Sequence, residues 1–296
     1  MRNHPRFKAY VALGAVCLFW GTTYAAIRIA LESMPPLVLI SLRFSISGAI
    51  TLAAAAVAGL EMPRGKELIR TALNGLLVLG VGNAALAVAE QWIPSGLAAL
   101  FITAGPFWMV GFEALVPGGA SLHGPSIAGM VLGLAGVVFL VGPAGLTGNS
   151  GSTLAGFLIL QLGCAGWSLG SILQRRSKTR AHLFASGGVQ QLATGLVYAI
   201  PAMLMHGKPV AWTSWGVLSL AYLVTFGSIV GYTAFIYAME TLPVTVVSIY
   251  NYINPVVAVF LGWLFFRESF GAREAIAMCI IFAGVAIVKS VERRPA

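Results

Sequence analysis

The chain has 296 residues, of which 58% are hydrophobic and only 9% are charged, and its mean hydropathy is +0.88. Soluble domains carry roughly 25% charged residues, so this composition excludes an ordinary soluble domain and indicates an integral membrane protein. The formal net charge of +9 does not indicate a nucleic-acid partner, because the basic residues cluster at the boundaries of apolar runs.

Glycine, proline and charged residues divide the chain into ten apolar runs. Each run is close to the ~20 residues that cross a hydrocarbon core of ~30 Å as a helix. In lipid, only helices and closed barrels satisfy every backbone polar group, and runs this long favour helices. We therefore predict an all-α integral membrane protein with ten transmembrane helices. The expected helices cover residues 9–30, 36–58, 68–89, 95–115, 124–142, 153–174, 183–205, 213–239, 244–266 and 272–289.

The first run carries an aromatic and polar group of residues near its middle. Trp20, Tyr24 and Arg28 are four residues apart and therefore share one helix face. Aromatic residues in a span commonly form a belt at the membrane interface, but Trp20 lies about midway through its run. This position favours a role for Trp20 in lining a cavity.

Charged residues are rare inside the runs, and the chain contains no Asp. Arg43 lies about seven residues into the second run, and Glu113 lies near the end of the fourth. Charges within spans are candidate functional groups, but both residues are close enough to an interface to extend their charged ends into it. The sequence leaves both interpretations open. We expect Arg28, Glu32 and Glu90 at the outer rim.

Polar and aromatic residues also occur in the third, sixth and eighth runs. Asn83 and Tyr232 occupy corresponding positions in the third and eighth runs, and the sixth contains Gln161 and Trp167. Amides such as Asn83 and Gln161 commonly hydrogen-bond between helices, and contact with a substrate is an equally good interpretation. We include all four residues among the candidates for substrate binding.

A proline interrupts the fourth run and another interrupts the ninth, each near the middle. A mid-helix proline removes one hydrogen bond and clashes with the carbonyl group four residues before it. At membrane depth, a freed carbonyl needs protein or a watery cavity around it. We therefore predict that Pro106 and Pro255 are gating helix breaks beside a substrate site, rather than structural kinks. The neighbouring candidates for substrate binding are Thr103, Trp108, Tyr252 and Asn254.

The second half of the chain repeats the first at an offset of about 149 residues. With five spans in each half, the odd number places the second half upside down in the membrane, as in many transporters. We predict two inverted five-helix repeats, residues 1–146 and 147–296, around a central cavity. The matched pairs are Gly82 with Gly231, Pro94 with Pro243 and Pro106 with Pro255.

The basic residues are distributed asymmetrically about the runs. With the N-terminus inside, thirteen of the eighteen Lys and Arg residues fall on cytoplasmic segments, which is the positive-inside pattern. We therefore expect both termini in the cytoplasm. The basic balance reflects orientation in the lipid membrane.

Motifs of enzymes and of cofactor sites are absent from the sequence. There is no HExxH motif, phosphate-binding loop, nucleophile elbow or paired carboxylates, and a catalyst needs such groups in its core. The three cysteines have no metal-ligand spacing. We expect no enzymatic activity, no cofactor and no metal site.

Three short motifs follow one another along the chain: Phe19-Trp20-Gly21-Thr22, Leu42-Arg43-Phe44, and Glu268 at the end of the ninth run. They resemble the EamA family of the drug/metabolite transporter superfamily, over essentially the whole chain. The resemblance implies ten helices in two inverted repeats that export small metabolites across the bacterial inner membrane. Within the family, the likeness is to the YddG-type exporters of aromatic amino acids.

The chain departs from the family pattern in two places. Gly119 stands at the position in the first half that corresponds to Glu268. The first run also lacks the carboxylate of the superfamily's small multidrug antiporters, which puts their proton-exchange mechanism in doubt.

These observations together predict a secondary transporter that exports aromatic or apolar amino acids and similar small metabolites by alternating access. The alternatives are a multidrug or other metabolite carrier, or a passive channel. Nucleotide sugars are disfavoured because no basic residue is expected at mid-depth. Facilitated export is favoured because no acidic residue is expected there either, with Glu113 as the one exception. The partners are a small-molecule substrate and membrane lipid, and the oligomeric state is left open, a monomer being compatible with the sequence.

Overall fold

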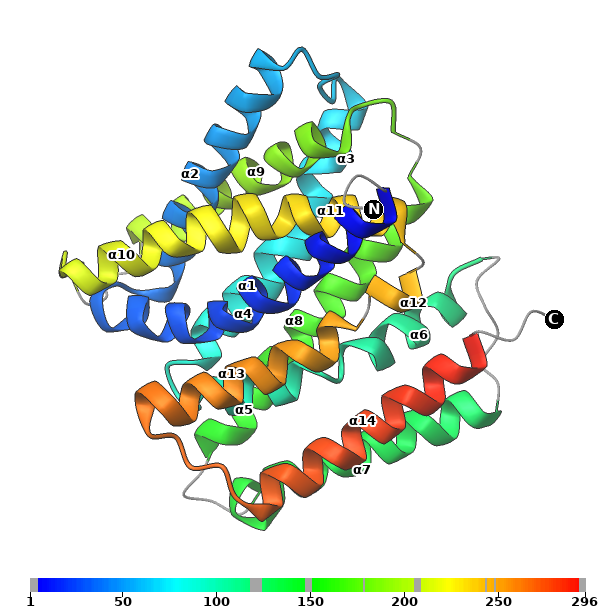
Figure 1. The fold of residues 1–296 in the computed structure, drawn as a ribbon. Helices are drawn as coiled ribbons and strands as arrows, with labels where there is room; N and C mark the ends of the chain where they lie inside the picture. The colour runs from blue at the N-terminus through cyan, green and yellow to red at the C-terminus, as the bar shows by residue number, and fades with distance from the viewer. Residues whose placement is uncertain are drawn as a thin grey trace.

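The computed structural model describes residues 5–117, 124–146, 151–177, 179–204, 209–242, 244–247 and 249–292. All regular secondary structure within these ranges is helical (Figure 1). Gly119 and Pro243, both used in the comparison of the two halves, lie outside the described residues, as do the first and last four residues of the chain.

Helices cover each of the apolar runs. Six runs form single helices: α1 (Pro5–Ser33), α2 (Pro36–Val57), α7 (Gly124–Leu146), α8 (Gly151–Arg176), α9 (Leu183–Leu204) and α14 (Ala272–Glu292). The third run is divided into α3 (Lys66–Gly75), η1 (Leu76–Val81) and α4 (Gly82–Ala89), and the eighth into α10 (Ser214–Tyr222), η2 (Leu223–Val230) and α11 (Gly231–Thr241). The fourth run forms α5 (Ser95–Ile102) and α6 (Gly105–Leu115), and the ninth forms α12 (Val244–Val247) and α13 (Tyr250–Phe266).

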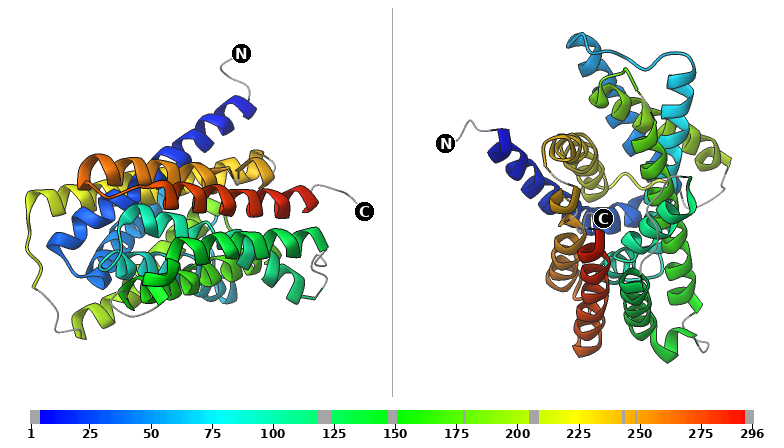
Figure 2. Two further views of the ribbon diagram at one scale, coloured as in Figure 1. Left: turned by 90° about the horizontal axis from the view of Figure 1, so that it is seen from below. Right: turned by 90° about the vertical axis from the view of Figure 1, so that its right-hand side faces the viewer.

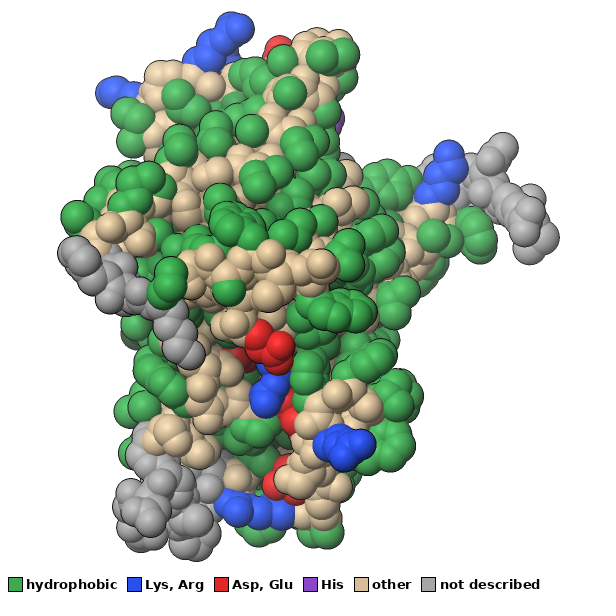
Figure 3. All heavy atoms as spheres, turned by 90° about the vertical axis from the view of Figure 1, so that its left-hand side faces the viewer, with side chains coloured by type: hydrophobic (Ala, Val, Ile, Leu, Met, Phe, Trp, Pro, Cys, Tyr) green, Lys and Arg blue, Asp and Glu red, His purple; other side chains and the backbone are tan. Residues whose placement is uncertain are grey.

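The length and composition of the helices confirm a multi-pass membrane protein. Within the described residues, six stretches are long and apolar enough to cross a membrane: Phe7–Ser33, Pro36–Val57, Lys66–Ala89, Ser95–Leu115, Ser152–Arg176 and Ser214–Met239. Many large apolar side chains are exposed, including Ile200 at 63% and Trp215 at 71%, and hydrophobic atoms cover much of the face in Figure 3. Apolar surface of this extent suits contact with lipid rather than water.

Contacts between helices from opposite halves of the chain organise the fold. α2 packs along α9, α7 packs along α14, and α1 packs against α11 and α13. α7 and α14 lie side by side on one flank of the molecule, and α2 and α9 lie on the opposite flank (Figures 1 and 2). The two halves are therefore interlocked rather than packed as separate bundles.

Glycine residues allow these helices to approach each other closely. A Cβ atom on Gly129 would lie 2.7 Å from the carbonyl oxygen of Gly284, and one on Gly284 would lie 2.6 Å from the carbonyl oxygen of Gly129. Between α2 and α9, a Cβ on Gly48 would collide with the backbone nitrogen of Leu192. Small residues of this kind let backbones pack in lipid, where burial from water contributes little.

Candidate functional site

A cavity of about 320 Å³ lies between helices of both halves. Its size falls within the ~300–1,000 Å³ of small-molecule sites. Most of the residues singled out from the sequence line it. They are Trp20, Asn83, Thr103, Pro106, Trp167, Tyr232, Asn254 and Pro255.

The remaining three candidates, Trp108, Gln161 and Tyr252, are not among the residues that line the cavity. The indole nitrogen of Trp108 donates a hydrogen bond to Oε1 of Gln161 over 2.9 Å. These two side chains are therefore paired with each other between α6 and α8. Tyr252 packs edge-on against the ring of Phe282 in α14, with ring centroids 5.2 Å apart. Substrate contact by these three residues remains a prediction without support from the geometry.

An aromatic cluster centred on Trp20 forms one wall. The Trp20 ring meets Trp167 of α8, Phe235 of α11 and Tyr250 of α13 at centroid distances of 5.9, 5.0 and 5.3 Å. Such tilted and edge-to-face pairs are favourable, and they bring four helices to one point. Phe235 was missed from the sequence, because nothing distinguishes it from the other phenylalanines of the spans.

Arg43 of α2 reaches the same cavity, which the sequence left open. Its side chain is buried, at 4% exposure, and it lines the cavity, so it does not extend to a membrane interface. Nε donates to Oγ of Ser228 over 2.8 Å, and one terminal nitrogen donates to Oδ1 of Asn83 over 3.3 Å. Among the described residues, no carboxylate lies within ion-pair distance of Arg43. A basic residue therefore lines the cavity, although the sequence did not place one among the candidates for substrate binding.

Two π-helical segments hold these polar residues in place. η1 ends immediately before Gly82, and η2 ends immediately before Gly231. A π-helical turn shifts carbonyl groups out of the α-helical pattern, and such turns are frequent at functional sites. Asn83 Nδ2 donates to the carbonyl of Leu79 in η1 over 3.0 Å, and Trp20 Nε1 donates to the carbonyl of Gly227 in η2 over 3.1 Å. Hydropathy patterning indicates neither segment.

The break in the fourth run lies at residues 103–104, and Pro106 occupies the first turn of α6. Side chains of α8 satisfy the carbonyls at this break. Gln161 donates to Phe101, Cys164 to Ile102 and Ser168 to Gly105, over 3.2, 3.7 and 3.2 Å. The prediction that Pro106 leaves the Ile102 carbonyl free beside a substrate is therefore wrong, because the Cys164 thiol occupies it.

Pro255 is placed differently from Pro106. It lies inside α13, which begins at Tyr250, so the run is interrupted before Tyr250 and not at the proline. The expectation of matching breaks at the two prolines is corrected accordingly. Pro255 cannot donate to the carbonyl of Asn251, and Asn251 lines the cavity. The amide nitrogen of Asn254, when turned toward its acceptors, lies 3.2 Å from the Tyr250 carbonyl and 3.0 Å from the Cys17 carbonyl.

At one end of the molecule, Glu268 joins three helices. Its carboxylate accepts hydrogen bonds from the backbone nitrogens of Ser95 and Gly96, over 2.9 and 3.0 Å, and from Ser95 Oγ over 3.0 Å. Arg28 of α1 forms an ion pair with it at 2.9 Å. The carboxylate thus caps the N-terminus of α5, where backbone N–H groups favour an anion. We call the end formed by Arg28, Glu268 and Ser95 the Glu268 end; acidic and basic side chains gather in the middle of this face in Figure 3.

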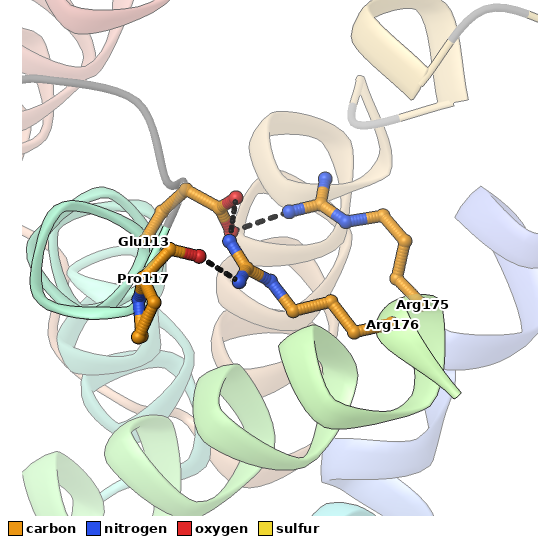
Figure 4. A network of polar contacts seen from close by, with 4 residues as sticks. All are labelled: Glu113, Pro117, Arg175 and Arg176. Carbon is orange, nitrogen blue, oxygen red and sulfur yellow. Dashed lines mark hydrogen bonds and ion pairs between the residues drawn. The ribbon is translucent and has the colours of Figure 1, made fainter.

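The opposite end carries a different charged group. Arg175 and Arg176 of α8 pair with Glu113 of α6 at 2.5 and 3.1 Å, and Arg176 also donates to the carbonyl of Pro117 over 2.7 Å (Figure 4). Both arginines are substantially exposed. Glu113 is therefore paired at a surface and does not line the cavity.

Replacing Pro106 with Ala tests whether the break in the fourth run matters for function. The alanine would supply an N–H group to the Ile102 carbonyl and favour a continuous helix, at about 1 kcal/mol for one hydrogen bond. We expect transport to fall to roughly a fifth, since that energy shifts an equilibrium about fivefold, while expression and monodispersity stay near wild type. We expect the same direction for Pro255→Ala.

Pro201→Ala is the matched control, because Pro201 also lies inside a helix, α9, and does not line the cavity. Initial rates of uptake into proteoliposomes measure the effect. Normal rates in both the Pro106 and Pro255 variants would show that these prolines are structural only.

Comparisons with known proteins are consistent over the whole chain. The model of the EamA-like transporter family matches residues 7–142 and again residues 154–290. The chain is 34% identical over 290 residues to an uncharacterized inner membrane transporter, YedA, of Escherichia coli K12, covering 97% of this chain and 92% of the relative. It is 28% identical over 228 residues to a probable amino-acid metabolite efflux pump of the same strain, covering 73% of each. A crystal structure of a protein superposes with a TM-score of 0.70 at 25% identity, covering 97% of this chain and 98% of the other.

Proposed function

Because the chain belongs to the EamA-like transporter family, we propose that it exports amino acids with aromatic or apolar side chains across the bacterial inner membrane. The observation that carries this proposal is Arg43, a buried cation on the cavity wall without a carboxylate partner among the described residues. A buried charge of this kind is costly unless it is paired. A substrate carboxylate would supply the pair.

The rest of the cavity suits the other parts of such a substrate. The Trp20 cluster offers ring faces and edges on which a planar or apolar side chain packs. Ring faces also attract an ammonium group, and the cavity wall includes the polar side chains of Asn251 and Asn254. A zwitterion with an aromatic side chain therefore finds a partner for each of its three groups.

The same geometry ranks the alternatives. A cationic drug would be repelled by Arg43, which disfavours a multidrug carrier. A nucleotide sugar carries two negative charges, and Arg43 is the single Lys or Arg on the wall of the described cavity, so such a substrate would be only partly neutralised. The relative named as a probable amino-acid metabolite efflux pump supports the amino-acid class.

We further propose ten spans in two inverted halves, with both termini in the cytoplasm. The separate matches of the family model to residues 7–142 and 154–290 support the repeat. The cavity-lining residues continue along α6 to Val110, along α8 to Ser171 and along α11 to Met239, toward the end that carries Arg175 and Arg176. We place that end in the cytoplasm by the positive-inside rule, with the cavity directed toward the cytoplasm and the Glu268 end directed outward.

Transport into proteoliposomes tests the function. Vesicles loaded with unlabelled phenylalanine should take up labelled phenylalanine with saturable kinetics, whereas a channel shows no such stimulation by substrate on the far side. 3-Phenylpropionate, which keeps the carboxylate, should compete, and 2-phenylethylamine, which lacks it, should compete at least tenfold more weakly. If none of the twenty amino acids is transported, the proposed substrate class is wrong.

A further inference from the structure

Glu90, which follows α4 directly, is a buried acid without hydrogen-bond partners. Its side chain is 6% exposed, and neither carboxyl oxygen has a partner among the described residues. The sequence placed Glu90 at the solvent-facing rim, and this expectation is wrong. Because an ionised carboxylate without donors is very costly to bury, the uncharged acid is the form that this environment accommodates.

Two charged groups act on Glu90, and both belong to the Glu268 end. Arg28 of α1 favours a negative charge on Glu90, whereas Glu268, beyond the end of α13, opposes it. The phenol of Tyr24, one turn before Arg28 in α1, also lies within electrostatic reach. No other charged group within the described residues is found to act on Glu90. The guanidinium of Arg28 is held by Glu268 at 2.9 Å and lies over the Phe266 ring.

Arg28 thus acts on two acids, of which it is paired only with Glu268. Glu268 is engaged by Arg28 and by the backbone at the start of α5. Glu90 has no such donors, and it would need Arg28 if it became ionised. A change in the protonation of Glu90 therefore changes the competition for Arg28, which joins α1 to the junction of α13 and α5.

We propose that the carboxyl group of Glu90 carries a proton that this transporter exchanges for its substrate. This inference rests on the proposed function for the identity of the transported molecule. In this arrangement Arg28 pairs with Glu268, and Glu90 is the group that would hold the proton. Glu90 itself does not line the cavity, but Tyr24, which lies within electrostatic reach of it, does.

The exchange cycle follows from the charges. Loss of the proton from the Glu90 O–H group to water on the cytoplasmic side leaves a carboxylate, which draws Arg28 from Glu268 and opens the outer end. After the substrate leaves, a proton from outside binds the Glu90 carboxylate, and Arg28 returns to Glu268. One proton enters for each substrate exported, and no bond other than this O–H bond breaks or forms. Facilitated export was favoured because no acidic residue was expected at mid-depth, whereas Glu90 lies at the end of α4.

Proteoliposomes with an imposed pH difference test the inference. Exchange of a proton for substrate predicts that phenylalanine accumulates in the more acidic compartment, whichever way the protein is inserted. Glu90→Gln mimics the protonated acid, so accumulation should fall at least tenfold. Glu113→Gln is the control, because Glu113 is paired at the opposite surface, and its accumulation should match wild type. No response of the wild type to the pH difference, or accumulation in the alkaline compartment, would overturn the inference.

Two further measurements separate this inference from the proposed function. Counterflow of phenylalanine without a pH difference tests the substrate class alone. Infrared absorption of the purified protein at neutral pH should show the band of a protonated carboxyl group, and this band should be missing from Glu90→Gln. This result needs no substrate, so it stands even if no amino acid is transported. Absence of the band from the wild type would show that Glu90 is ionised, and the inference would fail.

Discussion

Arg43→Gln is expected to raise the KM for a carboxylate substrate tenfold to a hundredfold while leaving the fold at least as stable as wild type. A hydrogen bond to a charged group contributes about 1.5–3 kcal/mol, which corresponds to that range. Stability should not fall, because the variant removes a buried cation that has no carboxylate partner among the described residues. Replacing an unpaired buried charge with a neutral group relieves its desolvation cost.

Kinetics of uptake and the thermal midpoint of the detergent-solubilised protein check the two effects separately. Arg175→Gln is the matched control, since Arg175 is exposed and pairs with Glu113 away from the cavity; neither its KM nor its midpoint should change appreciably. The carboxylate dependence should also disappear in Arg43→Gln, so that 3-phenylpropionate and 2-phenylethylamine compete more equally. A KM unchanged by Arg43→Gln would remove the observation on which the proposed substrate class depends.

Gly48→Ala is expected to lower the free energy of unfolding by about 2 kcal/mol. Its Cβ would collide with the backbone nitrogen of Leu192, and a backbone atom cannot move aside without separating α2 from α9. Overpacking typically costs about 1–3 kcal/mol, and here the rigid partner places the cost at the upper end. The better helix propensity of Ala returns only about 1 kcal/mol.

Gly14→Ala provides the control for helix propensity, because Gly14 also lies within a helix, α1, and a Cβ there would meet no atom within 4 Å. It should leave the thermal midpoint unchanged or raise it slightly. Both variants can be compared by the loss of monodisperse protein after heating. Equal midpoints for the two variants would mean that α2 and α9 adjust their spacing easily, contrary to the packing described above.

Hydropathy was sufficient to place the helices, because in lipid each span must satisfy its own backbone. Pro36–Val57 and Ser95–Leu115 coincide closely with the expected runs. The internal interruptions were harder to place. Pro106 lies next to its break, whereas Pro255 lies inside a continuous helix, because the effect of a proline depends on whether neighbouring side chains satisfy the displaced carbonyls. At the Pro106 break, α8 supplies those groups.

The cavity wall could be anticipated where a residue is unusual for its depth. Trp20, Asn83 and Tyr232 stood out because a polar or bulky aromatic group near the middle of a span indicates a cavity or a contact between helices. The direction of Arg43 was left open and Glu90 was wrongly placed at the rim, because a long charged side chain near the end of a span either extends to the interface or turns inward. That choice depends on partners from distant segments. Ser228 accepts a hydrogen bond from Arg43, and no residue within the described chain donates a hydrogen bond to Glu90. Sequence spacing does not reveal such tertiary partners.

The capping of α5 by Glu268 has a consequence for biogenesis. Ser95 and Glu268 are 173 residues apart, so the ribosome releases the start of α5 into the membrane long before its cap exists. α2 likewise cannot form its contacts with α9, nor α7 its contacts with α14, until those later helices are synthesised. Helix insertion and final assembly must therefore be separate stages, and the early segments depend on lipid, translocon or chaperone contacts until the last third of the chain is made. Truncation before residue 268 would leave an inserted but unfinished chain, the kind of substrate that membrane quality-control proteases remove.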